Sequence, residues 1–239
     1  MRTRKKKFLG ILLSLMLVLG LMIGLMITAH AATANWTFLT DSATDGSTTV
    51  VKSAGTYRVT LNADVNLGDV SVGVDPFGDK FPRILDLNGH TLTINNTTGH
   101  AINGWAPNSG EVCLTISDSS NGSGKIETYG STFWIDNSNG YYLFEGGTIT
   151  SKNGDGVNTG NTKKIIMNGG TITGCKGYGV NVNEIEIKGP VNITGNNGGN
   201  VYLASGKTIS VTGNLGNAKI SVTTQAVPTN TTPVVITNG

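Results

Sequence analysis

Three short segments in the second half of the chain alternate between apolar and polar residues. They are 157–159 (VNT), 180–182 (VNV) and 201–203 (VYL), and each begins with Val. This period of two predicts β-strands. We expect the first and third residue of each strand to face a core and the middle residue to face solvent.

Each of these strands closes a longer repeat of β-forming pair, Gly/Asn-rich turn and second strand. The copies are 149–159 (ITSKNGDGVNT), 172–182 (ITGCKGYGVNV) and 193–203 (ITGNNGGNVYL), which start 23 and 21 residues apart. A unit this short cannot bury its own apolar face and must stack on its neighbours. The repeat therefore predicts a β-solenoid with about 21–23 residues per coil.

Weaker copies extend the repeat in both directions. RILDLNGHTLTIN (83–95) is predicted to turn at Asn88-Gly89, and Gly-x-(x)-Ile phrases recur up to Gly206–Ile209. Anchoring the coils on one apolar residue each gives intervals of 34, 23, 23, 21 and 16 to 18 residues. The anchors are Leu92, Ile126, Ile149, Ile172, Ile193 and either Ile209 or Val211. The long first interval implies an inserted loop at 104–110, which includes Trp105.

Composition supports a single all-β domain, because 34 Gly accompany many Asn, Thr and Ser and only 13% of residues are charged. We expect residues 32–55 to cap the first coil, with Trp36 and Phe38 as an apolar lid, and 56–225 to form the solenoid. The Pro/Thr-rich tail 226–239 has no recognisable cap, and we expect it to be truncated or to precede another module.

Residues 1–31 have the pattern of a secretory signal peptide, with five basic residues, an apolar run and an A-H-A site before cleavage at Ala31. An uncleaved leader acting as a membrane anchor is the alternative. Without the leader, 12 Lys and Arg (17 minus 5) face 15 Asp and Glu, a net charge of −3. Nothing in this balance favours nucleic acid. An oxidising compartment outside the cell would permit a disulfide between Cys113 and Cys175, although their predicted positions do not favour one.

Several segments resemble secreted right-handed parallel β-helix repeat proteins of Gram-positive bacteria, in the pectate-lyase-like superfamily. They are 85–94 (LDLNGHTLTI), 114–126 (LTISDSSNGSGKI), the twice-used GGTIT and 199–222. The resemblance implies a right-handed parallel β-helix at or beyond the cell surface. It leaves function open, because that architecture serves lyases, hydrolases, epimerases, adhesins and passive stalks.

Aligning the repeats places a strip of amides and aromatics on the outer face, which suits stacking on sugar rings and bonding to hydroxyls. The candidate ligand-binding residues are Asn103, Trp105, Trp134, Asn158, Asn181 and Tyr202. An ordinary hydrophilic β-face is the alternative. We expect no metal and no cofactor, since neither a calcium loop with its full acidic spacing nor a dinucleotide fingerprint occurs.

These observations predict a secreted or surface-bound structural and adhesive module that binds polysaccharide or a host or cell-wall surface. No catalytic residue is assigned. The alternatives are a carbohydrate-active enzyme, which would gather two of Asp86, Asp118, Asp136 and Asp155 within about 10 Å in a groove, and an inert stalk.

Overall fold

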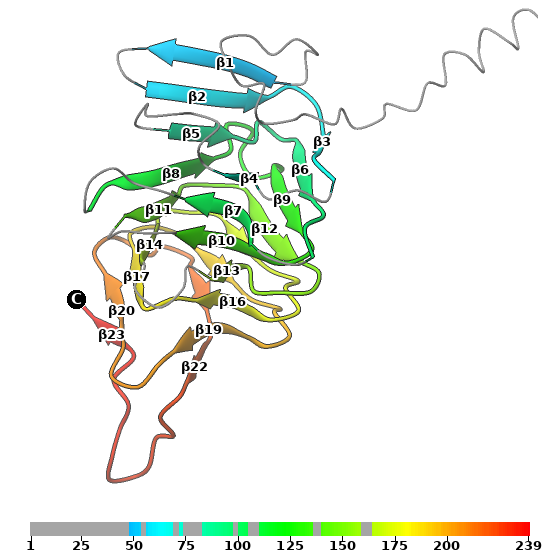
Figure 1. Ribbon diagram of the computed structural model, residues 1–239. Coiled ribbons are helices and arrows are strands. Elements are labelled where there is room, and N and C mark those ends of the chain that lie inside the picture. The colour runs from blue at the N-terminus through cyan, green and yellow to red at the C-terminus, as the bar shows by residue number, and fades with distance from the viewer. Residues whose placement is uncertain are drawn as a thin grey trace, which may run out of the picture.

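The computed structural model describes residues 48–53, 56–68, 72–73, 83–97, 100–104, 110–135, 140–158 and 164–239. Within them the chain is an all-β parallel solenoid of about six turns, and the strands stack into long faces (Figure 1). The predicted fold class is confirmed. The leader 1–31, Trp36, Phe38, Trp105 and Asp136 lie outside the described residues.

Sheet 1 forms the first face and has nine strands, all parallel to their neighbours except the antiparallel pair β1–β2. Its strands, in spatial order, are β1 (Thr48–Ser53), β2 (Thr56–Leu61), β5 (Arg83–Asp86), β8 (Val112–Ser117), β11 (Tyr141–Phe144), β14 (Lys164–Met167), β17 (Glu184–Ile187), β20 (Ile209–Val211) and β23 (Thr237–Asn238).

Sheet 2 forms the second face and has seven parallel strands. They are β3 (Val65–Asn66), β6 (Thr91–Ile94), β9 (Lys125–Thr128), β12 (Thr148–Ser151), β15 (Thr171–Ile172), β18 (Asn192–Ile193) and β21 (Lys219–Ile220).

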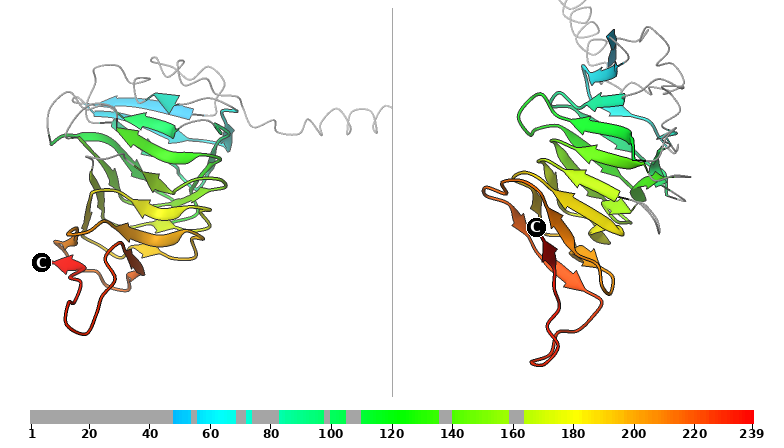
Figure 2. Two further views of the ribbon diagram at one scale, coloured as in Figure 1. Left: turned by 60° about the horizontal axis from the view of Figure 1, so that its bottom comes forward. Right: turned by 90° about the vertical axis from the view of Figure 1, so that its left-hand side faces the viewer.

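The third face is divided into two sheets. Sheet 3a contains β4 (Val72–Gly73), β7 (His100–Gly104) and β10 (Ser131–Ile135). Sheet 3b contains β13 (Val157–Asn158), β16 (Tyr178–Asn181), β19 (Gly199–Leu203) and β22 (Val222–Thr224). Each coil therefore runs from sheet 1 through sheet 2 to the third face (Figure 2).

The predicted apolar anchors pair with one another along sheet 2, with one exception. Leu92, Ile126, Ile149, Ile172 and Ile193 are successive register partners. The next partner is Ile220, 27 residues after Ile193, so the prediction of Ile209 or Val211 was wrong. Because the phrase ending at Ile209 directly follows β19, it begins a new coil, and every coil begins in sheet 1.

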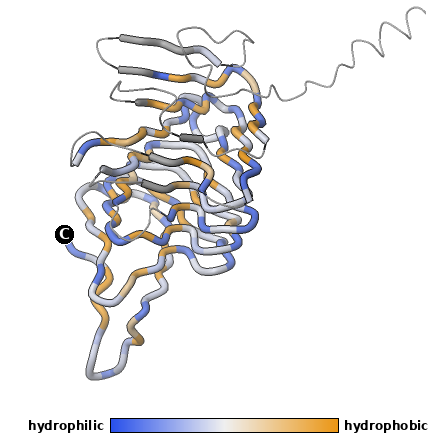
Figure 3. The backbone as a smooth tube through the Cα atoms, viewed as in Figure 1, coloured by the Kyte–Doolittle hydropathy of each residue, from blue (hydrophilic) through white to orange (hydrophobic). Residues whose placement is uncertain are grey.

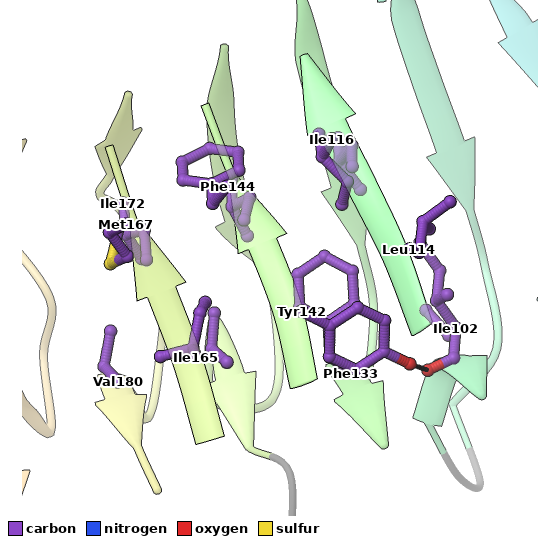
Figure 4. Packing of buried hydrophobic residues seen from close by; sticks show 14 of the residues in the cluster. Ile102, Leu114, Ile116, Phe133, Tyr142, Phe144, Ile165, Met167, Ile172 and Val180 are labelled. Carbon is purple, nitrogen blue, oxygen red and sulfur yellow. Dashed lines mark hydrogen bonds between the residues drawn. The ribbon is translucent and has the colours of Figure 1, made fainter. Parts of the chain in front are cut away.

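Alternation within the strands builds a continuous core. Val157, Val180, Val201 and Leu203 are buried as predicted, and hydrophobic positions recur along the coils in Figure 3. The largest side chains fill the middle of the solenoid, where the rings of Phe133 and Tyr142 lie 4.6 Å apart (Figure 4). The Tyr142 hydroxyl donates a hydrogen bond of 3.3 Å to the carbonyl oxygen of Ile102. Each such buried aromatic contributes about 2–3 kcal/mol.

The two cysteines are part of this core and not of a disulfide. Neither Cys113 nor Cys175 forms a disulfide, and both are fully buried. Burial raises the pKa of the Cys175 thiol to about 11, against a smaller opposing effect of a backbone hydrogen bond. The charge of Asp155 raises it further. Both therefore act as small apolar side chains.

Asparagine, glycine and aspartate make the turns between sheets. Asn88 and Gly89 have φ angles of 46° and 83°, which confirms the predicted turn, and only Gly and short polar residues adopt such angles readily. The Asp118 carboxylate accepts hydrogen bonds from the N–H groups of Gly89, Ser120, Gly122 and Gly124. Gly89 and Asp118 belong to consecutive coils, so the hydrogen bond between them joins the two coils at this corner.

The two ends of the solenoid differ. At the first coil, the antiparallel strand β1 covers the edge of β2 in sheet 1. At the last coil, the apolar residues Val211, Leu215, Ile220 and Val222 are only partly buried. The segment between β22 and β23 projects beyond that coil and carries exposed Val227, Val235 and Ile236 (Figures 1 and 2). A helix able to span a bilayer does not occur in the described parts of the chain.

Candidate functional site

The predicted strip lies on the third face of the solenoid. Asn158 pairs with Asn181, Asn181 with Tyr202, and Tyr202 with Thr223, so these four residues form one column on sheet 3b. Trp134 pairs with Asn103 on sheet 3a. All the side chains of the sheet 3b column are at least partly exposed.

The strip is divided, because sheets 3a and 3b do not share a strand ladder. β10 follows β9 after the two residues 129–130, whereas β13 follows β12 after the five residues 152–156. Phe133 is buried as expected for this shorter turn. The two sheets meet where the Thr132 N–H donates to the carbonyl oxygen of Asp155 at 3.3 Å. Sheet 3b is the part whose side chains can be described in full.

Asp155 lies in the turn just before β13, the end strand of sheet 3b, and contacts the first two coils of the strip. One carboxylate oxygen, Oδ2, accepts hydrogen bonds from the side-chain amides of Asn158 (3.0 Å) and Asn181 (3.2 Å). The other, Oδ1, accepts the backbone N–H of Tyr178 at 2.7 Å. Two adjacent coils are thus joined by one carboxylate, and the orientation of both amides is fixed.

Two tyrosine rings adjoin this polar centre. Tyr178 and Tyr202 lie on neighbouring coils with ring centroids 5.0 Å apart and planes inclined by 41°. Tyr178 pairs with Gly199, and a Cβ atom at Gly199 would come within 3.0 Å of the Tyr178 ring and 2.9 Å of the Thr223 hydroxyl. The absence of a side chain at Gly199 therefore lets the Tyr178 ring lie against the next coil. The result is a partly exposed aromatic surface beside the carboxylate and amides.

The sequence repeat did not identify Tyr178 or Asp155 as members of the strip. Both belong to Gly-rich stretches, NGDGVN and KGYGVN, that are typical of turns. The available signal was their spacing: Asp155 precedes Asn158 by three residues, as Tyr178 precedes Asn181 and Gly199 precedes Tyr202. Strand β16 begins at Tyr178, so the position three residues before the column also contributes to the outer surface.

The carboxylates considered for catalysis are used to hold turns together. Asp86 is 4% exposed and accepts hydrogen bonds from the Arg58 guanidinium at 2.8 Å and from the N–H groups of Asn88 and Ser119. Partial burial acts to raise the pKa of Asp118. The Ser120 hydroxyl and the N–H groups around the carboxylate outweigh this effect and lower the pKa. The lowered pKa of Asp118 is opposite to the raised pKa that a proton donor in a glycosidase needs.

Two further glutamates form ion clusters away from the strip. On sheet 2, Glu127 contacts Lys125 and Lys152, each at 2.6 Å, and these two hydrogen bonds lower its pKa. On sheet 1, Glu186 contacts Lys164 at 2.5 Å and Lys188 at 3.1 Å. The Lys164 hydrogen bond outweighs burial and lowers the pKa of Glu186 to about 2. Each cluster ties two or more coils together.

The described residues contain no group of three or more His, Cys, Asp or Glu side chains arranged to hold a metal ion. A hollow of about 270 Å³ lies on the outer side of sheet 1. It is lined by Lys164, Asn183, Glu184, Ile185, Glu186, Gly206, Lys207, Thr208, Ser210 and Asn238. Since this lining contains no aromatic ring, the sheet 3b strip is the surface better suited to stacking on a ligand.

Neither family models, nor curated proteins, nor solved structures give a match to this chain.

Proposed function

We propose that this chain is an exported structural and adhesive module that binds polysaccharide through the outer face of sheet 3b. The observation that carries the proposal is the Tyr178–Tyr202 pair, 5.0 Å between ring centroids, next to the Asp155 carboxylate and its two bonded amides. Aromatic rings stack on the apolar faces of sugars, while carboxylate and amide groups bond sugar hydroxyls.

The arrangement of the strip supports a polymeric ligand. Its residues come from successive coils, which are spaced by about 4.8 Å in a parallel sheet. An extended sugar chain would therefore meet equivalent positions repeatedly along the column Asn158, Asn181, Tyr202 and Thr223. Because Asp155 holds the side-chain amides of Asn158 and Asn181, little entropy of these two side chains would be lost on binding.

Export is supported by the leader pattern of residues 1–31, and a surface location by the resemblance to secreted β-helix proteins of Gram-positive bacteria. In that setting the polysaccharide would belong to a cell wall or a host surface. The solenoid would hold the strip at a fixed distance from its attachment point.

The test is retention of residues 32–239 on insoluble polysaccharides and mobility shifts in gels that contain soluble ones, with new chain ends measured in the same samples. We expect retention without cleavage. Replacing both Tyr178 and Tyr202 with Ala should lower affinity at least about tenfold, since each stacked ring contributes roughly 1 kcal/mol.

Tyr141→Ala is the matched control, because Tyr141 is a partly exposed tyrosine on sheet 1. It should bind as the unchanged protein does. New chain ends would replace the proposal with a carbohydrate-active enzyme. Absence of both binding and cleavage across the panel would favour an inert stalk.

A further inference from the structure

The Asp155 carboxylate is a charged group in the sheet 3b strip, and neutral groups donate hydrogen bonds to it. Its three hydrogen bonds come from the amides of Asn158 and Asn181 and from the Tyr178 N–H. A carboxylate offers about four acceptor positions. Asp155 is partly exposed and so retains acceptor capacity toward a ligand beside the two tyrosine rings.

Among the described residues, Lys152 and Lys176 of the adjoining turns do not form ion pairs with this carboxylate. Lys152 contacts Glu127 at 2.6 Å and the Tyr129 hydroxyl at 3.3 Å, so its ammonium group faces sheet 2. Lys176 is exposed in the turn before β16, where solvent and salt screen its charge. The exported part of the chain is also negative overall, with 12 basic and 15 acidic residues after removal of five basic residues of the leader from the total of 17.

The charge of Asp155 acts on its surroundings. It adds to the effect of burial in raising the pKa of the Cys175 thiol, which lies inside the same coil. A second negative charge placed over the strip would therefore meet repulsion that the fixed geometry cannot relieve. A ligand hydroxyl in the same place would donate a hydrogen bond to a charged acceptor, which is among the stronger kinds.

We infer that the strip selects uncharged, hydroxyl-rich polysaccharides and excludes those made of uronate or sulfated sugars, with Asp155 as the selecting residue. This inference rests on the proposed function. Asp155 accepts hydroxyl hydrogen bonds, the tyrosine rings stack on the sugar, and a sugar carboxylate or sulfate is repelled. The acceptor-rich centre is thus the part of the strip that distinguishes one class of glycan from another.

The experiment measures retention of the full mature chain on a neutral β-glucan, a neutral mannan and polygalacturonate, at low and at high salt. We expect binding to at least one neutral polymer and much weaker, still measurable, retention on polygalacturonate at low salt. Asp155→Asn should weaken neutral binding about tenfold, because a hydrogen bond to a charged group is lost. Its retention on polygalacturonate should rise about fourfold, the effect of removing one charge at roughly 5 Å in water.

Glu184→Gln is the matched control, since it removes one exposed carboxylate from sheet 1 and should change neither retention. Asp155→Glu keeps the charge and should still exclude polygalacturonate, so the inference does not depend on one variant folding. In the unchanged protein, added salt should weaken the exclusion of polygalacturonate.

Tyrosine-dependent binding to polygalacturonate that equals or exceeds binding to the neutral polymers would overturn the inference and leave the proposed function in place. Equal neutral binding by Asp155→Asn and the unchanged protein would do the same. Absence of binding to any of the three polymers would remove both.

Discussion

Close stacking of coils at the corner between sheets 1 and 2 depends on glycine to different degrees in different coils. Gly146, Gly169 and Gly189 each follow the last paired residue of a sheet 1 strand by two positions. A Cβ atom at Gly146 would lie 3.4 Å from its nearest neighbour, an ordinary contact, and at Gly169 2.8 Å from the Glu145 carbonyl oxygen. At Gly189 it would overlap the Asn168 carbonyl oxygen. Replacement by Ala should therefore give a graded series.

The magnitude for Gly189→Ala follows from the contacts at that corner. To relieve the overlap the coil must move away from its neighbour, which disturbs two backbone hydrogen bonds, Lys188 N–H to Met167 O (2.9 Å) and Asn192 N–H to Gly170 O (3.0 Å). Each contributes about 1 kcal/mol, and the strain adds about 1–3 kcal/mol. Ala also restricts the unfolded chain, which stabilises the folded state by about 0.4–1 kcal/mol. We expect a net loss of about 3 kcal/mol.

The assay is urea unfolding followed by circular dichroism on all three variants. Gly146→Ala should be neutral or up to about 1 kcal/mol more stable, and Gly169→Ala should lose about 1–2 kcal/mol. Equal stability of the Gly146 and Gly189 variants would refute the argument that backbone contact between coils sets the requirement for glycine.

Three other changes test the core, a corner and an ion cluster. Phe144→Ala should lower the free energy of unfolding by about 3–5 kcal/mol through the cavity it leaves, measured by the same assay, whereas Phe144→Leu should cost much less. Asp118→Ala should cost about 2–3 kcal/mol at pH 7, because several N–H donors, most of them partly buried, lose their acceptor. Because folding lowers the pKa of Asp118, its contribution to the free energy of unfolding is present above the ordinary value of 3.8 and is lost as the pH falls below it. Unfolding measured at pH 7 and at pH 2.5 would detect this. Glu186→Gln should cost about 1 kcal/mol at neutral pH after allowance for solvent screening. Since the pKa of Glu186 is about 2 rather than 4.5, the difference from the unchanged protein should narrow as the pH falls from 4.5 toward 2, and a difference independent of pH would contradict this.

The repeat predicted the solenoid because inward apolar residues must match from coil to coil. Register from Leu92 to Ile193 follows directly from that requirement. The prediction was wrong at Ile209. The local sequence there resembles a sheet 2 strand, but the segment lies in sheet 1. A local sequence pattern does not show which face of the coil the chain has reached. The pairing between strands decides this.

The candidate site was predicted only in part for a similar reason. The column of Asn158, Asn181 and Tyr202 is visible from alternation, since Asn181 and Tyr202 each stand between two buried residues and Asn158 follows the buried Val157. The roles of Asp155 and Tyr178 depend on hydrogen bonds and ring contacts between coils, 23 or 24 residues apart in sequence. Such contacts arise from stacking and leave no short-range pattern.

The partly exposed apolar residues of the last coil set the direction in which the solenoid opens. In a stacked array each coil is held mainly by its neighbours, so fraying begins in the coil whose apolar residues are least buried and moves inward. Amide hydrogen exchange should therefore be fastest in β20–β22, slower in β17–β19 and slowest in the middle coils. The strip spans β13, β16, β19 and β22, so a polysaccharide lying across it would clamp the fraying coils to the stable ones. Occupancy of the site would then be measurable as slowed amide exchange in β20–β22.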